Sequence, residues 1–199
     1  MRIGIFGGTF DPPHLGHLIL ADEARIELEL AQIYFVLTPN PPHKQGITVT
    51  SVEIRLEMLA KALSGEPSFV ISRVDLDRDP PHFAVDTVEI FREMMPGTTL
   101  VYLMGGDSLR DLPTWHHPVD FVDACDLIGV MSRPQVEVDI KSLAVKVPGI
   151  ITKLRFIDAP LLEISSSDLR WKIANGEPYR FYLRESVWKF IQSKKLYRE

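Results

Sequence analysis

The feature that most restricts the fold of this sequence is a short apolar run followed by a loop rich in glycine, proline and histidine. The run includes Ile3, Ile5 and Phe6, and its length and branching predict a buried strand. The loop Gly-Gly-Thr-Phe-Asp-Pro-Pro-His-Leu-Gly-His follows at residues 7–17, and a helical pattern comes next. A strand, a loop and a helix in this order form the junction at which α/β proteins bind phosphate groups.

Glycine and histidine each have a physical use in this loop. Gly7 and Gly8 lack a Cβ atom, so their backbone N–H groups can approach a ligand closely. His14 and His17 are three residues apart on one face of the first helical turn, where the positive end of the helix favours anions. Gly16 leaves room for a flat group to pass near the backbone. A structural turn with two incidental histidines is the alternative, but the combination favours a phosphate site.

The rest of the chain alternates apolar runs with helical patterns. Further strands are predicted to end near residues 37, 72, 104, 131 and 157, the first helix covers 15–30, and the last covers 184–195. Strand, helix and strand at this spacing form a right-handed unit with parallel strands. The sequence therefore predicts an α/β fold, a Rossmann-like doubly wound parallel sheet of about six strands with helices on both faces. We expect a single domain over 1–199, on which a C-terminal helical part at about 165–199 packs.

A capping pattern predicts the start of the helix after the second strand. Thr50 and Glu53 have the spacing of a capping box. Arg55 then falls on the predicted polar side of this helix. Most arginines on such a face are solvated, so Arg55 is a weak candidate for the site.

Several polar residues follow predicted strands, and the carboxyl ends of parallel strands share one edge of a sheet. Lys44 follows the second strand and Arg133 follows the fifth. Gly105 and Asp107 lie in a turn after the fourth strand, where Asp107 can accept hydrogen bonds from a ribose or cap a helix. Trp115 lies nearby and is either a stacking surface or part of the core. We expect Lys44 to contact phosphate; a solvated loop lysine is the alternative.

A second motif, Ile-Ser-Ser-Ser-Asp-Leu-Arg, occupies residues 164–170. Ser165, Ser166 and Ser167 open a helix whose first N–H groups have no partner within the helix. Arg170 lies about one turn further on, where its planar fork can reach a phosphate. A helix cap explains one serine, but it explains neither the other two nor the arginine.

Composition excludes several classes of protein. The 199 residues carry a formal net charge of −5, which argues against a surface that coats nucleic acid. Cys125 is the sole cysteine, so neither an intramolecular disulfide nor a thiolate zinc cluster can form, and its apolar neighbours predict a buried thiol. No apolar run approaches the length of a membrane span, and the start lacks the regions of a signal peptide. We expect a cytoplasmic protein that binds neither nucleic acid nor membranes.

The loop after the first strand resembles the signature of the nucleotidylyltransferase superfamily, Gly-x-Phe-Asp-Pro-x-His-x-Gly-His, at residues 8–17. With its extra glycine it is similar to the bacterial nicotinate mononucleotide adenylyltransferases, and the similarity runs through nearly the whole chain. Further matching segments are Pro41–Lys44, Asp86-Thr87, Gly105-x-Asp107 with Trp115, Ser132–Pro134, Ile164–Arg170 and Leu196-Tyr197.

This sequence departs from the family pattern at two places. Phe83-Ala84 stands where the family usually has Tyr-Thr, so a hydroxyl near the pyridine ring is missing and recognition there must use backbone N–H groups. Ser167 stands where the family often has threonine, which is a mild difference.

The resemblance implies three sets of site residues. The catalytic set is His14, His17, Lys44 and Arg170. The set that binds ATP and its phosphates is Gly7, Gly8, Thr9, Phe10, Gly16, Gly105, Asp107, Arg133, Ser165 and Ser166. The set that binds nicotinate mononucleotide is Thr9, Lys44, Ala84, Val85, Thr87 and Trp115.

The resemblance also implies a reaction. The 5′-phosphate of nicotinate mononucleotide attacks the α-phosphorus of ATP in line, pyrophosphate leaves, and nicotinate adenine dinucleotide forms for NAD biosynthesis without a covalent enzyme intermediate. Mg²⁺ would accompany ATP and be held mainly by the phosphates, so no protein metal ligands are predicted. The expected partners are these two small molecules, and the sequence is compatible with a homo-oligomer.

Three other functions fit parts of the sequence. Another nucleotidylyltransferase, such as the phosphopantetheine enzyme, usually has a shorter chain without the Asp-Thr and Trp features. A class I aminoacyl-tRNA synthetase fragment shares the His-x-Gly-His motif, but it needs a lysine-rich second signature and a tRNA-binding extension. A non-catalytic nucleotide sensor should have lost phosphate donors, yet this sequence retains all of them.

Overall fold

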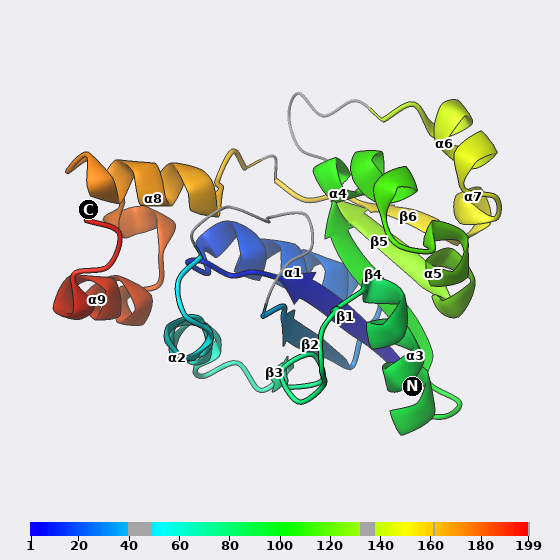
Figure 1. Cartoon of the computed structure of the whole chain (residues 1–199), viewed down its shortest axis with the longest axis horizontal. Helices are drawn as coiled ribbons and strands as arrows, with labels where there is room; N and C mark the ends of the chain where they lie inside the picture. The colour runs from blue at the N-terminus through cyan, green and yellow to red at the C-terminus, as the bar shows by residue number, and fades with distance from the viewer. Residues whose placement is uncertain (40–48, 132–137, 161, 199) are drawn as a thin grey trace.

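The computed structural model describes residues 1–39, 49–131, 138–160 and 162–198. Its centre is a six-stranded sheet in the order β3-β2-β1-β4-β5-β6, and every neighbouring pair is parallel (Figure 1). The strands are β1 (Arg2–Gly8), β2 (Gln32–Leu37), β3 (Phe69–Ser72), β4 (Thr99–Gly105), β5 (Leu127–Met131) and β6 (Leu154–Ile157). The order reverses between β1 and β4, as in a doubly wound Rossmann-like fold, which confirms the predicted fold class.

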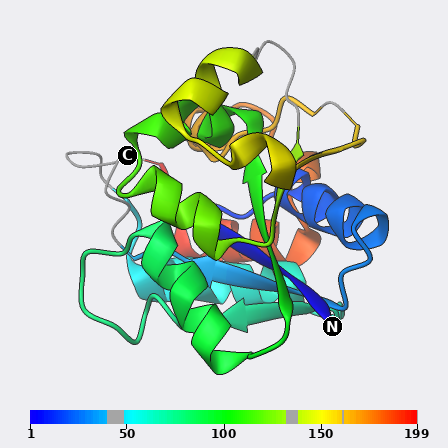
Figure 2. The ribbon, with the colours of Figure 1, turned by 90° about the vertical axis from the view of Figure 1, so that its right-hand side faces the viewer.

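Helices cover both faces of this sheet, and α1 and α3 lie on opposite sides of it (Figure 2). The α-helices are α1 (Leu15–Glu27), α2 (Val52–Leu63), α3 (Ala84–Met94), α4 (Gly106–Asp111), α5 (Pro118–Ala124), α6 (Ile140–Lys146), α7 (Ile150–Lys153), α8 (Ser166–Ala174) and α9 (Glu185–Lys194). At 13 residues, α1 is the longest helix in the described ranges. Within those ranges, therefore, no helix has the length and apolar character that crossing a bilayer requires.

Each face of the sheet has its own apolar core. On one face, Leu20 and Ala24 of α1 pack with Phe35 of β2 and Leu103 of β4. The other face holds a cluster in which residues of α3 and α5 pack on β1, β4 and β5. Because side chains alternate along a strand, the central strands supply apolar residues to both clusters.

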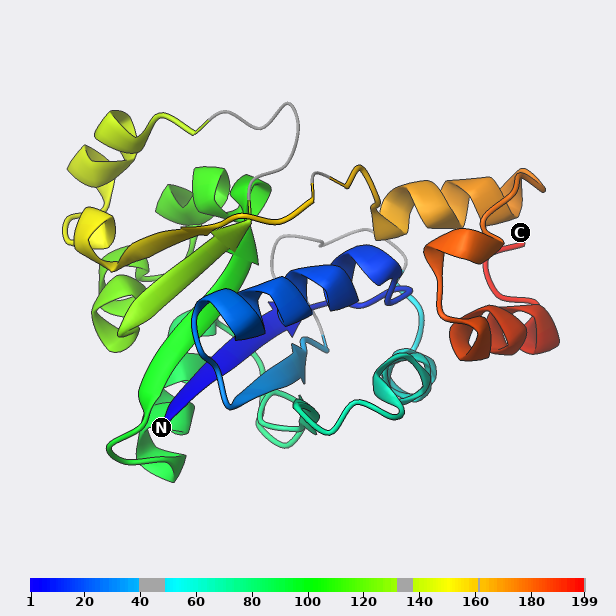
Figure 3. The same ribbon diagram turned by 180° about the vertical axis from the view of Figure 1, so that it is seen from behind.

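A third apolar cluster joins the C-terminal helices to α2. Met58 and Ala62 of α2 pack with Leu169 and Ile173 of α8 and with residues of α9. Figure 3 shows α8 and α9 together at one end of the molecule, with α6 and α7 at the other end. The C-terminal helices thus lie against the same helix that follows β2.

Two predicted helix boundaries are wrong, each for a local reason. Helix α1 ends at Glu27, because Glu29 adopts a left-handed conformation (φ 54°) and the Leu30 N–H donates to the Arg25 carbonyl at 2.8 Å. This is a Schellman ending with glutamate in the position that glycine usually takes. Helix α2 is capped by Ser51, whose Oγ accepts from the Ile54 N–H at 3.5 Å, so the predicted Thr50–Glu53 capping box does not form.

Candidate active site

The predicted phosphate loop lies at the point where the order of the strands reverses. Strand β1 ends at Gly8 and its neighbour β4 ends at Gly105, in the middle of the sheet. From these ends the chain continues into α1 on one face and into α4 and α5 on the other. Ligands of doubly wound folds bind in the crevice outside the carboxyl ends of the strands at such a point.

Steric contacts explain both glycines of the loop. A Cβ atom on Gly7 would lie 2.7 Å from the hydroxyl of Tyr102, and one on Gly8 would lie 2.8 Å from the ring of Phe10. Phe10 is 2% exposed, has a φ of 49° and packs edge-on to Phe6. Its side chain therefore serves the core, and the predicted contact of Phe10 with ATP could use only its main chain.

The two motif histidines form one unit at the start of α1. His14 is the N-cap, and its N–H donates to Nδ1 of His17 at 3.2 Å. The two rings stack with centroids 3.6 Å apart and an interplanar angle of 22°. A neutral imidazole that accepts at Nδ1 carries its proton on Nε2, so His17 is an Nε2–H donor in this arrangement.

Gly16 is explained by the same pair. A Cβ atom there would lie 3.0 Å from Nδ1 of His14, which is itself 2% exposed. We predicted that Gly16 makes room for a flat group, and in the structure the imidazole of His14 occupies that space. Gly16 therefore supports the histidine pair, and its predicted direct role in binding ATP has no separate support.

The structure corrects the prediction for Arg55, which is buried rather than solvated, with 1% of its surface exposed. Its guanidinium donates to four carbonyl oxygens, at distances of 2.7–3.1 Å, which belong to Thr9, Thr38, Pro39 and Thr50. One cation thus holds together the phosphate loop, the end of β2 and the approach to α2. The signal was present in the sequence, because Arg55 precedes the buried Met58, Leu59, Ala62 and Leu63 at the spacing of one helical stripe.

Asp11 supplies the negative charge that faces Arg55. Burial lowers the pKa of Arg55, and the nearby Asp11 opposes that shift. Asp11 is 2% exposed, and its carboxylate accepts from the Thr50 N–H at 3.1 Å and from the Tyr197 hydroxyl at 2.6 Å. The motif aspartate therefore fixes the loop and makes its contacts with the protein itself.

The second motif lies against the first. Ser165 caps α8 by accepting from the Asp168 N–H at 3.1 Å. Ser166 donates to the Pro12 carbonyl at 2.9 Å, and Nη1 of Arg170 donates to the Asp11 carbonyl at 2.7 Å. The structure thus brings α8 to the phosphate loop, as predicted, and it also gives Ser166 and Arg170 a role in holding that loop.

Some residues predicted to form the pyridine pocket pack against one core cluster. Helix α3 begins at Ala84, and Phe83, Ala84 and Trp115 pack against the same core cluster. The Trp115 ring lies 5.2 Å from Phe121 between centroids, and the ring of His116 stacks on Phe83 at 3.8 Å. Partly buried Trp115 is therefore part of the core edge beside the start of α3.

Thr87 does not fit its predicted role. It is 3% exposed, and its hydroxyl donates to Asp75 at 2.8 Å. Its N–H donates to the Phe83 carbonyl at 3.2 Å within the first turn of α3. The hydroxyl and the N–H of Thr87 are thus engaged inside the protein, and of the predicted residues only Ala84 and Val85 keep an N–H without an intrahelical partner at this helix start.

Two pairs of predicted residues are left: Gly105 and Asp107 after β4, and Lys44 and Arg133. Asp107 lies in the first turn of α4, whose N-cap is Gly105, so the alternative in which Asp107 is the cap is wrong. Lys44 and Arg133 lie outside the described residues.

In the part of the chain that the structure describes, no three or more His, Cys, Asp or Glu side chains are grouped to hold a metal ion. Cys125 is 1% exposed, and burial raises the pKa of its thiol, which fits the predicted buried residue.

Comparison with known proteins matches this architecture. The family model of cytidylyltransferase-like proteins matches residues 5–172, from β1 into α8. The solved structure of Plasmodium falciparum nicotinic acid mononucleotide adenylyltransferase complexed with NaAD has the same fold, with a TM-score of 0.81 at 20% identity over 98% of this chain and 97% of that one. The fold and the phosphate loop thus define a cytidylyltransferase-like nucleotidyltransferase.

Proteins of similar sequence identify one family within this class. A protein of Thermomicrobium roseum is 42% identical over 99% of this chain and 92% of its own length, and one of Oceanobacillus iheyensis is 37% identical over 98% and 96%. Both are described as probable nicotinate-nucleotide adenylyltransferases. The chain belongs to the nicotinate-nucleotide adenylyltransferase family.

Proposed function

We propose that this protein joins ATP and nicotinate mononucleotide to give nicotinate adenine dinucleotide and pyrophosphate, a step of NAD biosynthesis. The observation that carries the proposal is the stacked His14–His17 pair at the N-terminus of α1, where β1 meets β4. A helix N-terminus with an imidazole donor is suited to the charge of a triphosphate. The names of the sequence relatives support the choice of substrates.

The proposed reaction is a direct in-line displacement. An oxygen of the 5′-phosphate of the mononucleotide forms a bond to the α-phosphorus of ATP, and the bond between that phosphorus and the bridging oxygen of pyrophosphate breaks. Such transfers need positioning and charge neutralisation more than covalent chemistry. His17 would donate from Nε2 to a phosphate oxygen, and the backbone of Gly7, Gly8 and Thr9 would line the path of the phosphates.

Cationic side chains would complete the phosphate site. We propose that Lys44 and Arg170 contact the phosphates from opposite sides, with Arg133 at the same edge of the sheet. Arg170 already donates from Nη1 to the Asp11 carbonyl and from Nη2 to the Ser167 hydroxyl at 3.4 Å, so its other N–H groups would serve the ligand. Mg²⁺ would enter with ATP and neutralise phosphate charge, held by phosphate oxygens and water.

The start of α3 supports nicotinate as the ring that is bound. Its first N–H groups, at Ala84 and Val85, have no intrahelical partner and present the positive end of the helix. They suit the carboxylate of nicotinate, whereas the NH₂ of nicotinamide would meet other donors. Trp115, beside them, would offer an aromatic face to the pyridine ring.

One assay tests the proposed function. The purified protein is incubated with ATP, Mg²⁺ and either nicotinate or nicotinamide mononucleotide, and the products are identified by mass. We expect the dinucleotide and pyrophosphate, with kcat/KM higher for nicotinate mononucleotide by about 10-fold or more, the scale of one mismatched buried donor. Absence of dinucleotide with both substrates would overturn the proposal, and equal efficiency with both would overturn the assignment of the pocket.

A further inference from the structure

The last residues of the described chain reach the phosphate loop. The hydroxyl of Tyr197 donates to Oδ1 of Asp11 at 2.6 Å, although the two residues are 186 positions apart. Tyr197 follows α9 and has a φ of 62°. A left-handed backbone at an aromatic residue is uncommon and persists where the surroundings determine it. The segment Leu196-Tyr197 is one of those that match the family pattern, but the proposed reaction gives it no role.

Tyr197 is one of three C-terminal donors to two consecutive residues of the loop. Arg170 donates to the main-chain carbonyl of Asp11 and Ser166 to that of Pro12. His14 is only two residues beyond Pro12, and its N–H is the donor that orients His17. The C-terminal part of the chain therefore fixes the segment that leads directly into the histidine pair.

The hydroxyl of Tyr197 also completes the surroundings of a buried carboxylate. Oδ2 of Asp11 accepts from Thr50, and Oδ1 accepts from Tyr197. Burial, and next the charge of Asp11, raise the pKa of Tyr197, so its hydroxyl stays protonated and donates across the neutral range. Removing this donor would leave Oδ1 of Asp11 without its partner while Oδ2 stays bound to the Thr50 N–H, and one of the contacts that fix the loop at this residue would be lost.

We propose that Tyr197 is a positioning residue of the phosphate site, which acts through Asp11 to set the backbone geometry of the His14–His17 pair. The inference rests on the proposed function for its effect on catalysis. Misplacement of a catalytic group by about 1 Å can cost roughly 100-fold in rate. Loss of one hydrogen bond at Asp11, three residues before His14, should therefore lower kcat while the binding of both substrates is preserved.

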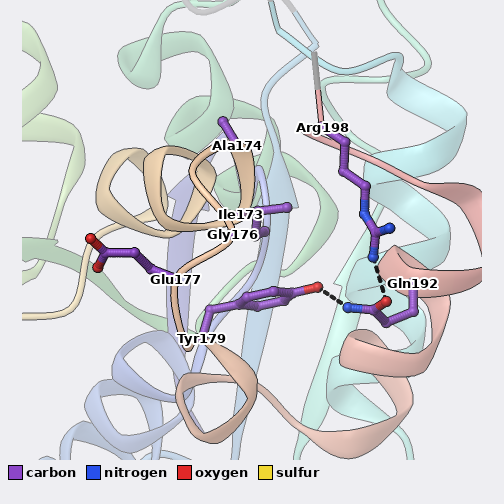
Figure 4. A pocket seen from close by; sticks show the side chains of 7 residues that line it. All are labelled: Ile173, Ala174, Gly176, Glu177, Tyr179, Gln192 and Arg198. Atoms are coloured by element: carbon purple, nitrogen blue, oxygen red, sulfur yellow. Dashed lines mark hydrogen bonds between the residues drawn. The ribbon is translucent and has the colours of Figure 1, made fainter.

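The chain offers a matched control in the same helical region. The Tyr179 hydroxyl accepts a hydrogen bond from the Gln192 amide of α9, and Figure 4 shows this pair beside Arg198 in a pocket between α8 and α9. Tyr179→Phe removes a partly buried C-terminal hydroxyl without touching the phosphate loop. Tyr197→Phe removes the hydroxyl on Asp11 and keeps the ring.

The first measurement is steady-state kinetics of both variants, well below their melting temperatures. We expect Tyr197→Phe to lower kcat by about 10- to 100-fold with both KM values near those of the wild type, and Tyr179→Phe to leave kcat near the wild-type value. In an Asp11→Ala background, which removes the acceptor, Tyr197→Phe should have little further effect, because the two residues act through one contact. Wild-type kcat in Tyr197→Phe, equal losses in both Tyr variants, or full additivity with Asp11→Ala would overturn the proposal.

A second measurement does not depend on activity. Long-range ¹H–¹⁵N spectra of histidine-labelled protein without substrates report the protonation pattern of each imidazole. We expect Tyr197→Phe to shift the signals of His14 and His17, and Tyr179→Phe to leave them in place. If the wild type makes no dinucleotide, the proposed function fails and these spectra still test the positioning role; unchanged His17 signals in Tyr197→Phe would overturn it.

Discussion

The N–H of His14 donates to Nδ1 of His17 at 3.2 Å, and the two imidazoles stack at 3.6 Å between centroids. This contact couples two roles in one side chain. Nδ1 of His17 completes the start of α1, and Nε2 is left to carry the proton that a phosphate oxygen requires. The structural role of His17 and its proposed catalytic role can therefore be separated by substitution.

Two substitutions of His17 should separate these roles. His17→Ala and His17→Asn should both lower kcat by about 100-fold or more, the scale of losing one preorganised donor. The asparagine oxygen can still accept from the His14 N–H, so only the alanine variant should also lose about 1 kcal/mol of unfolding free energy. Kinetics and urea unfolding measure the two effects, and near-normal turnover of folded His17→Asn would rule out the catalytic role.

Arg170 should not tolerate lysine, despite the equal charge. One nitrogen of the planar fork holds the Asp11 carbonyl, and the proposed phosphate contact would use the others; an ammonium could not span both. We expect Arg170→Lys to lower kcat/KM for ATP by about 10-fold or more, the value of one charge-assisted contact. Arg184→Lys is the control, because Arg184 donates to the carbonyls of Ala62 and Ser64, away from the phosphate loop. Equal behaviour of the two variants would make Arg170 a purely structural residue.

Arg55 should contribute more to stability than an exposed arginine. Arg55→Met leaves four carbonyls without their cationic donor and leaves Asp11 without its opposing charge, so the free energy of unfolding should fall by about 3–5 kcal/mol. Arg73→Met, which removes an exposed ion pair with Asp77, should cost no more than about 1 kcal/mol. Urea unfolding of both variants checks this difference, and a similar loss in each would contradict it.

Substitution of Trp115 should weaken the binding of nicotinate mononucleotide rather than that of ATP. If the pyridine ring lies on its face, Trp115→Ala should raise the KM for nicotinate mononucleotide by about 10-fold, since stacking on an aromatic side chain contributes roughly 1–3 kcal/mol. Trp171→Ala is the control, because Trp171 is 57% exposed on α8. A Trp115→Ala variant with an altered KM for ATP alone would show that the pocket is misplaced.

Tyr197 should make stability fall at alkaline pH. In the folded protein, burial and Asp11 raise its pKa above the ordinary value of 10.0, so the folded state retains the proton that the unfolded state loses. The contribution is therefore complete below about pH 10 and declines as the pH rises further. The unfolding free energy of the wild type should fall more steeply above this pH than that of Tyr197→Phe, and parallel curves would contradict the assignment. Other tyrosines titrate alike in both proteins and cancel in the comparison.

The sequence alone was sufficient to predict the sheet class and the position of the phosphate loop. Both depend on local patterns: the short apolar run before Gly7, the spacing of His14 and His17, and the alternation of strands with helices. A local contact also determined that α8 begins at the serines. The hydroxyl of Ser165 accepts from the N–H of Asp168, three residues further on, and donates to its carboxylate. Such features depend on the order of residues over one or two turns, which the sequence displays directly.

Only the tertiary structure decided which residues hold the loop. The spacing of Arg55 with the buried stripe of α2 indicates that it is buried, but only the fold shows that carbonyls from three separate segments converge on it, and buried carbonyls require donors. Thr87 was assigned to the mononucleotide site, but the fold brings Asp75 within 2.8 Å of its hydroxyl. The contact between Tyr197 and Asp11 joins the two ends of the chain. No local pattern predicts it, because it exists only when α2, α8 and α9 have packed into one cluster.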